Sequence, residues 1–135
     1  MISRTVTTVL DAPSREVYEF LSDVGNLPAW ATEFARELKY DRGKAKVLNG
    51  LGELYFSISA DPDTGVIDMY AGPTEDAMAL FPTRVVPLGP GRSAYTFTMF
   101  KDPEMDDALF ESQHRSLLRE FENIRERFSG DRHPG

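Results

Sequence analysis

The end of the chain carries the pattern that most restricts its fold. Over residues 106–128, apolar side chains recur at spacings of three and four, which predicts one long amphipathic helix. Asp106 suits the N-cap of this helix, and Met105 and Phe110 occupy the two positions of a hydrophobic staple. A helix with one apolar stripe has to bury that stripe against another element. The stripe is expected to comprise Phe110, His114, Leu117, Phe121, Ile124 and Phe128.

The residues before this helix supply that element, because their pattern changes to the period of strands. Turn signals rich in Gly, Pro and Asn separate segments of strand composition. Links this short favour antiparallel hairpins, since parallel pairing needs a long crossover. The predicted strands cover residues 44–47, 53–60, 65–71, 77–86 and 93–101. In two of them, alternation directs inward Leu54, Phe56 and Ile58, and Tyr95, Phe97 and Met99.

The start of the chain predicts a strand and two short helices. Residues 2–10 are rich in Val and Thr, and Pro13 suits the first turn of a helix that is expected to bury residues 17, 20, 21 and 24. A second helical piece is expected to begin near residues 27–30 and to end before Lys39. The element order predicts an α+β fold in which a curved antiparallel sheet wraps around the long C-terminal helix, with room between them. We expect one domain over residues 1–128 and a polar tail over 129–135.

Composition excludes several classes of function. Fifteen Lys and Arg against twenty-two Asp and Glu give a net charge of −7, which argues against nucleic-acid and anionic-membrane partners. No apolar run approaches the ~20 residues that cross a bilayer, and residues 1–11 lack an apolar signal core. We therefore expect a cytoplasmic protein without stable membrane insertion. The chain has no Cys and two His, of which His133 falls in the predicted tail, so we expect no metal site and no cofactor.

The order of elements and several short segments resemble the superfamily of START-related lipid-transfer, birch-allergen-like and polyketide-cyclase proteins (SRPBCC). The segments are DAP at 11–13, VYEFLSD at 17–23 and NLPAW at 26–30. The resemblance covers residues 2–128 and implies a helix-grip fold with a cavity between the sheet and the C-terminal helix. Members bind lipids, sterols, polyketides, plant hormones or quinones, and a minority catalyse cyclisation or dehydration in that cavity.

The chain is more narrowly similar to an uncharacterised bacterial branch of that superfamily. This likeness is carried by GVID at 65–68, PTRVVP at 82–87 and YTFTMF at 95–100. The branch often has a His directly after the Asp, where this chain has Met69, so no role of that His is transferred. If Met69 faces the cavity, the pocket is more apolar there.

The preferred hypothesis is a binding protein for a small, mostly apolar ligand of lipid, sterol, quinone or aromatic polyketide type. A lining of this kind equally describes an ordinary core, and the resemblance raises the pocket interpretation to equal weight. Trp30 either covers the cavity mouth or pins its helix to the sheet. The candidate ligand-binding residues are Trp30, Phe56, Met69, Tyr95, Phe97, Met99, Phe110, His114, Leu117 and Phe121.

His114 is the polar residue within the predicted stripe. There are two alternatives to the binding hypothesis, and only the first depends on His114. A polyketide cyclase or dehydratase-like enzyme would use His114 as acid and base, although a half-buried His bonded to a strand Tyr or a backbone carbonyl is the commoner arrangement. An interaction module would instead use an exposed apolar patch near Tyr55 or Tyr70. Arg84 is expected to face solvent, since Arg is seldom buried, and its facing and that of Asp68 stay open at this stage.

Overall fold

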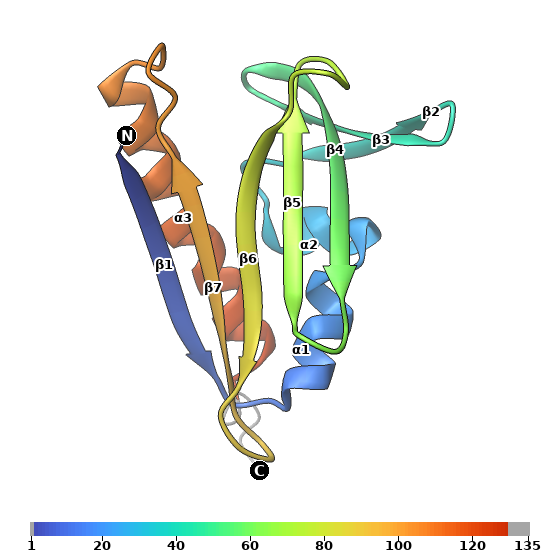
Figure 1. The fold of residues 1–135 in the computed structure, drawn as a ribbon, viewed down its shortest axis with the longest axis vertical. Helices are drawn as coiled ribbons and strands as arrows, with labels where there is room; N and C mark the ends of the chain where they lie inside the picture. The colour runs from blue at the N-terminus through green and yellow to red at the C-terminus, as the bar shows by residue number, and fades with distance from the viewer. Residues whose placement is uncertain (1, 130–135) are drawn as a thin grey trace.

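The computed structural model describes residues 2–129 (Figure 1), so most of the predicted tail, residues 130–135, lies outside the described residues. The elements follow the predicted order closely. They are β1 (Ser3–Leu10), α1 (Ser14–Leu21), the 3-10 helix η1 (Val24–Asn26), α2 (Leu27–Trp30), β2 (Glu37–Asp41), β3 (Lys44–Asn49), β4 (Gly52–Asp61), β5 (Val66–Gly72), β6 (Ala79–Pro87), β7 (Ser93–Phe100) and α3 (Asp107–Arg127).

The strands of the described region form one curved seven-stranded sheet, and the helices lie on one of its faces (Figure 1). The strand order is β1-β7-β6-β5-β4-β3-β2, and every neighbouring pair is antiparallel. The first and last strands along the chain, β1 and β7, pair with each other, and β1 contacts α3. The predicted α+β helix-grip fold is confirmed.

The long C-terminal helix begins where the sequence predicts. The Asp106 side chain accepts a hydrogen bond from the Ala108 N–H at 3.0 Å and so caps α3. Phe110, Leu117, Phe121 and Ile124 of this helix are buried. None of the helices within residues 2–129 is long and apolar enough to span a membrane.

The strand β2 corrects the prediction of a helical piece that continues toward Lys39. The helix α2 ends at Trp30, and Glu37–Asp41 instead pairs with β3 through a tight turn. Arg42 and Gly43 in that turn both have positive φ angles, of 55° and 80°, which suits a two-residue hairpin. Most side chains of β2 are exposed because it is an edge strand, so no apolar alternation marked it. Val24 is likewise only half-buried, in η1 rather than in α1.

Candidate functional site

Most of the predicted ligand-binding residues meet in one apolar core between the sheet and α3. Trp30, Phe56, Met69, Tyr95, Met99, Phe110, Leu117 and Phe121 all belong to it, and Phe97 packs against it. The register explains the convergence, because Tyr95 lies opposite Val85 on β6 and Thr8 on β1. Residues that alternate along each strand therefore reach the same concave face.

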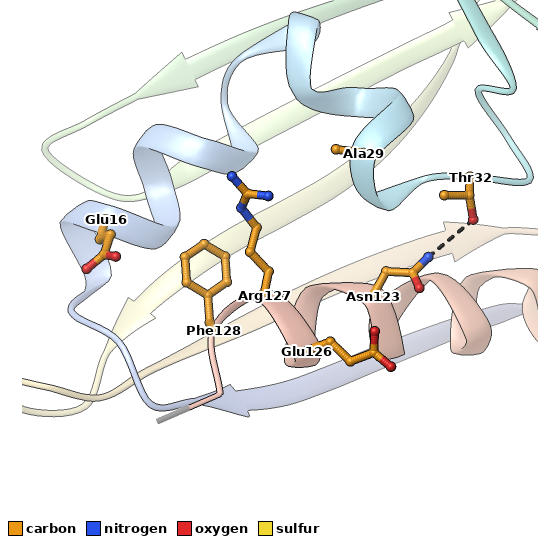
Figure 2. A pocket seen from close by; sticks show the side chains of 7 residues that line it. All are labelled: Glu16, Ala29, Thr32, Asn123, Glu126, Arg127 and Phe128. Atoms are coloured by element: carbon orange, nitrogen blue, oxygen red, sulfur yellow. Dashed lines mark hydrogen bonds between the residues drawn. The ribbon is translucent and has the colours of Figure 1, made fainter. Parts of the chain in front are cut away.

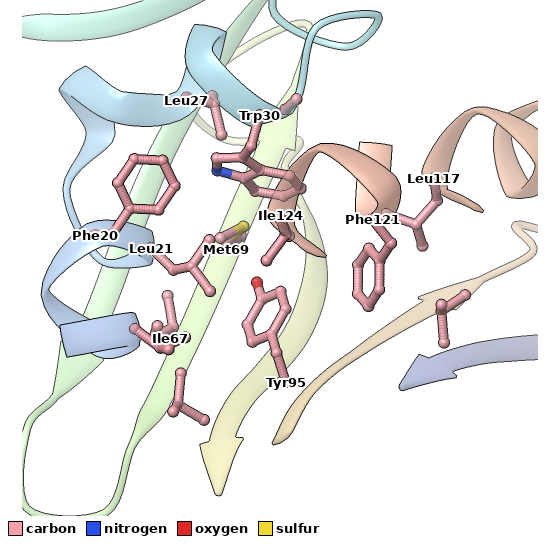
Figure 3. Close-up of a cluster of buried hydrophobic side chains, with 14 of the residues drawn as sticks. Phe20, Leu21, Leu27, Trp30, Ile67, Met69, Tyr95, Leu117, Phe121 and Ile124 are labelled. Atoms are coloured by element: carbon pink, nitrogen blue, oxygen red, sulfur yellow. The ribbon is translucent and has the colours of Figure 1, made fainter. Parts of the chain in front are cut away.

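Tyr95 is at the centre of this cluster and is fully buried (Figure 3). Its ring stacks on Phe121 with 5.5 Å between centroids, and the Trp30 ring meets it edge-on at 6.4 Å. In Figure 3 the Tyr95 hydroxyl points away from β7 toward the side chains of Met69, Ile124 and Trp30. Apolar groups from β5, α2 and α3 thus lie around the phenol oxygen, and the Thr83 hydroxyl of β6 is near it.

The Tyr95 hydroxyl is the one buried side-chain polar atom in residues 2–129 that has no hydrogen-bond partner. Burial raises the pKa of the phenol above its ordinary value, and the neighbouring Thr83 hydroxyl opposes that rise in part. The Thr83 hydroxyl itself donates to the Ile67 carbonyl at 2.6 Å. Leaving a buried hydroxyl unpaired costs about 1–3 kcal/mol, so this position carries a polar atom at a cost to folding.

His114 is the candidate that the structure does not bring into the cluster. Its side chain is half-buried, and the described residues give it no hydrogen bond or ion pair. At about 100° per residue, His114 and Glu120 lie on opposite flanks of the apolar stripe of α3. The segment after α2 covers the flank with Glu120, which is buried, and leaves His114 half-buried at the edge of the stripe, without the Tyr or carbonyl partner that was expected for it.

That covered flank is a polar stripe of α3 that the sequence analysis missed. It consists of Ser116, Arg119, Glu120 and Asn123, at positions i, i+3, i+4 and i+7. The stripe holds residues 31–36, which connect α2 to β2 and which we call the strap. The helical spacing of these polar residues beside the apolar stripe could have indicated a buried polar contact. An ordinary solvated helix face has the same spacing, so the sequence alone does not distinguish the two.

Glu120 makes the most buried of these contacts. One of its carboxylate oxygens, Oε2, accepts hydrogen bonds from the backbone N–H groups of Glu33 at 3.0 Å and Phe34 at 2.9 Å. Burial raises the pKa of the Glu120 carboxyl to about 7. The two N–H donors oppose that rise, the Glu33 carboxylate adds to it, and Arg119 lowers it.

The remaining strap contacts surround this buried acid. Arg119 forms a bidentate ion pair with Glu33, at 2.7 and 2.6 Å, and the Ser116 hydroxyl donates to the same carboxylate at 2.9 Å. Asn123 donates to the Trp30 carbonyl at 2.9 Å and to the Thr32 hydroxyl at 3.2 Å. The strap is therefore bound to α3 through helix side chains rather than through a backbone ladder.

Residues on the other face of the sheet take no part in the core. Arg84 is exposed and donates from Nε to the Thr64 carbonyl at 3.0 Å, so it faces solvent as expected. Tyr55 and Tyr70 are half-buried, and the Lys46 ammonium covers the Tyr55 ring at 4.5 Å.

Two surface hollows lie away from the predicted ligand residues. The first, of about 650 Å³, is lined by residues of α1, α2 and the end of α3, among them Glu16, Asn123 and Arg127 (Figure 2). The second, of about 460 Å³, lies beside α1 and the β4–β5 turn. Neither is lined by a residue that the sequence predicted to bind ligand. Among residues 2–129, no cluster of three or more His, Asp or Glu is arranged to hold a metal ion.

Comparison with solved structures places this architecture among known folds. The protein XoxI from Bacillus cereus superposes with a TM-score of 0.76 at 13% identity, over 98% of this chain and 99% of that one. A START superfamily protein from Mycobacterium smegmatis gives a TM-score of 0.64 at 16% identity, over 93% of this chain and 96% of that one. This chain has a START-like fold.

A biosynthetic protein shares the START-like fold as well. The di-domain ARO/CYC protein BexL, from the BE-7585A biosynthetic pathway, gives a TM-score of 0.73 at 15% identity. The match covers 93% of this chain and 46% of BexL, so the chain spans about half the length of that protein. No family model matches the sequence, and no curated protein matches it significantly.

Proposed function

We propose that this protein binds a small, mostly apolar ligand between the sheet and α3, with the Tyr95 hydroxyl as the polar contact. The ligand class is that of lipids, sterols, quinones or aromatic polyketides. The proposed lining is the set of core residues that the sequence analysis selected around Tyr95. The proposed compartment is the cytoplasm, and nucleic acid is not a proposed partner.

The unpartnered hydroxyl of Tyr95 carries this proposal. A Phe at position 95 would keep the same ring contacts with Trp30 and Phe121 without burying an unpaired oxygen. Buried polar groups in folded proteins nearly always have partners, so the exception calls for an explanation. A carbonyl or hydroxyl of a bound apolar molecule would complete the missing hydrogen bond.

The surroundings of Tyr95 also restrict the charge of the ligand. The side chains that enclose the hydroxyl are those of Met69, Ile124 and Trp30, and none of these carries a charge. A charged ligand group at this position would lose its hydration without gaining a counter-ion. The ligand is therefore proposed to be neutral at the end that meets Tyr95.

A pair of matched probes tests this proposal. Menadione carries ring carbonyls that accept a hydrogen bond, whereas a dimethylnaphthalene of similar outline carries none. We expect calorimetry to show about tenfold tighter binding of menadione, because one hydrogen bond contributes about 1–1.5 kcal/mol. Tyr95→Phe should abolish that preference while retaining binding of the hydrocarbon.

Tyr70→Phe is the matched control, because Tyr70 neighbours Met69 on β5 and therefore faces the opposite side of the sheet. This control should keep the menadione preference of the unaltered protein. Absence of binding by both probes, or an unchanged preference in Tyr95→Phe, would refute the proposal.

A cyclase or dehydratase-like enzyme that uses His114 as acid and base is the second candidate. The likeness to the ARO/CYC protein BexL favours it. The imidazole has no side-chain partner in the described residues, whereas acid–base catalysis usually orients the imidazole with a second group. Turnover of an aromatic polyketide thioester that disappears in His114→Ala, with probe binding retained, would favour the enzyme over the binding protein.

A further inference from the structure

The strap covers the part of the core that contains Tyr95. It follows directly on Trp30, whose ring meets Tyr95, and its residues Ala31 and Ala35 are buried. Phe34 of the strap packs edge-on against Phe56 of β4 with 5.9 Å between ring centroids. A ligand that enters the core from this side has to displace these residues.

The strap has few backbone hydrogen bonds of its own. Ala35 N–H donates to the Ala31 carbonyl at 2.7 Å, which closes one turn within the strap. Arg36 N–H donates to the Leu48 carbonyl at 3.0 Å and attaches its far end to β3. Between these points, the N–H groups of Glu33 and Phe34 both donate to Glu120, and the Phe34 carbonyl accepts a hydrogen bond from the Asn49 side chain at 2.8 Å.

We propose that the strap is a proton-controlled cover of the core, which neutral Glu120 holds closed and charged Glu120 releases. Both strap N–H groups bind the same oxygen, Oε2, and this leaves Oε1 to carry a proton. The neutral acid thus keeps both hydrogen bonds and avoids burying a charge. The charged acid keeps the same bonds but is held away from water.

Linkage fixes the direction of the effect. With the strap closed, burial raises the pKa of Glu120 to about 7, and an open strap would return this carboxyl to water and to its ordinary value of 4.5. The closed form therefore binds the proton more tightly than the open form does. Raising the pH through the interval between these two values shifts the strap toward opening.

The charged groups that act on Glu120 come from both sides of the contact. Glu33 of the strap raises the pKa of Glu120, and Arg119 of α3 lowers it. These two groups form an ion pair with each other, and Arg36 of the strap adds a further positive charge near Glu33. Because both members of the pair stay ionised across this interval, Glu120 is the group whose charge changes.

Hydrogen exchange at the Glu33 and Phe34 amides tests the strap without any ligand. After correction for intrinsic rates, we expect opening at these amides to increase by more than about tenfold between about pH 5 and pH 8. Glu120→Gln imitates the neutral acid and should keep the strap closed at both pH values. Glu120→Ala removes the acceptor and should leave the amides open at both.

Glu122→Gln is the matched control, because Glu122 lies on the same helix and pairs with Arg125 instead of the strap. It should exchange like the unaltered protein. Exchange at Glu33 and Phe34 that does not respond to pH, or a Glu120→Gln protein that still opens at high pH, would overturn the proposal. If Glu120→Ala fails to fold, the pH series and Glu120→Gln still show whether strap opening depends on the charge of Glu120.

The role of the strap as an entrance rests on the proposed function and has its own measurement. The association rate of the neutral probe N-phenylnaphthylamine should increase from about pH 5 to pH 8 and should stay slow in Glu120→Gln. Exchange that follows the prediction without any probe binding would uphold the strap and refute ligand binding. Probe binding at a pH-independent rate with uniform exchange would refute the strap alone.

Discussion

The helix α3 has two buried faces, one made of apolar side chains and one made of polar side chains. Its apolar face packs Phe121 and neighbouring side chains against the sheet, where contact with Tyr95 and Phe97 aromatic rings replaces water. Its polar face binds the strap through Glu120, Arg119 and Asn123. Opposite the apolar face, the Tyr95 hydroxyl of β7 has no hydrogen-bond partner. On the polar face, the buried Glu120 carboxyl accepts two hydrogen bonds from the strap.

The two faces therefore differ in how their contributions to stability respond to pH. The apolar face gains free energy from area removed from water, which pH hardly changes. The polar face depends on a carboxyl whose pKa is raised to about 7, so its contribution changes near neutral pH. The strap is thus the part of the core boundary that a change of pH can loosen without disturbing the sheet.

Truncation of the apolar face should have the largest effect. Phe121→Ala removes a fully buried ring that contacts Tyr95 and Phe97, and we expect a loss of about 3–5 kcal/mol in the free energy of unfolding. Urea denaturation followed by the fluorescence of Trp30 measures it. Leu118→Ala, at an exposed position of the same helix, should stay within about 0.5 kcal/mol. Equal losses in both variants would contradict the comparison.

The polar face should give the protein a pH dependence of stability. The pKa of Glu120 is about 7 in the folded chain against an ordinary 4.5, so the unfolded chain releases this proton first as pH rises. The stabilisation from this group is complete below the unfolded value and is lost as pH rises through about 7, on the order of 3 kcal/mol in all. Urea midpoints at a series of pH values should fall across this interval in the unaltered protein and flatten in Glu120→Gln. A larger fall in the variant would reverse the assignment.

Removal of the unpartnered oxygen should change stability by a smaller amount and in the opposite direction. Tyr95→Phe keeps the stacked ring and deletes a buried hydroxyl that lacks a partner, so we expect a gain of up to about 1 kcal/mol. Differential scanning calorimetry without ligand checks this. A clear loss of stability would mean that the hydroxyl has a partner in solution, which would remove the main support for the ligand site.

Disruption of the exposed ion pair should have the smallest effect on global stability. Arg119 is exposed and Glu33 is half-buried, and pairs that water reaches contribute little because water screens them. We expect Arg119→Gln to leave the melting temperature nearly unchanged. Any effect should decrease further in high salt. A strong, salt-insensitive loss would show that this pair, and not Glu120, secures the strap.

Much of the fold was predictable because its elements repeat a local pattern. The apolar spacing of α3 and the alternation in β4 and β7 report the side that each element buries. The same periods selected the residues that gather around Tyr95, since an inward position on a strand or helix stays inward in any arrangement of these elements. The edge strand β2 escaped prediction because most of its side chains face solvent and leave no period to detect.

The candidate site was predictable only in part. Tyr95 was selected as an inward aromatic residue, but its missing hydrogen bond depends on which groups of β5, α2 and α3 surround its hydroxyl. His114 and Glu120 are both ionisable residues beside the apolar stripe, and sequence spacing favoured His114. In the structure Glu120 is the buried residue of the two, because the strap covers its flank of α3 and leaves the flank with His114 half-exposed.

Apart from the edge strand β2, the sequence by itself determined the element order, the long capped helix, the antiparallel strands and the apolar identity of the core. These follow from periodicity, capping and turn chemistry, which act between residues close in the chain. Only the tertiary structure decided that Glu120 is buried against the backbone of Glu33 and Phe34 and that the Tyr95 hydroxyl lacks a partner. The reason is that hydrogen-bond satisfaction and desolvation depend on groups brought together from distant parts of the chain, and no local pattern records which groups these will be.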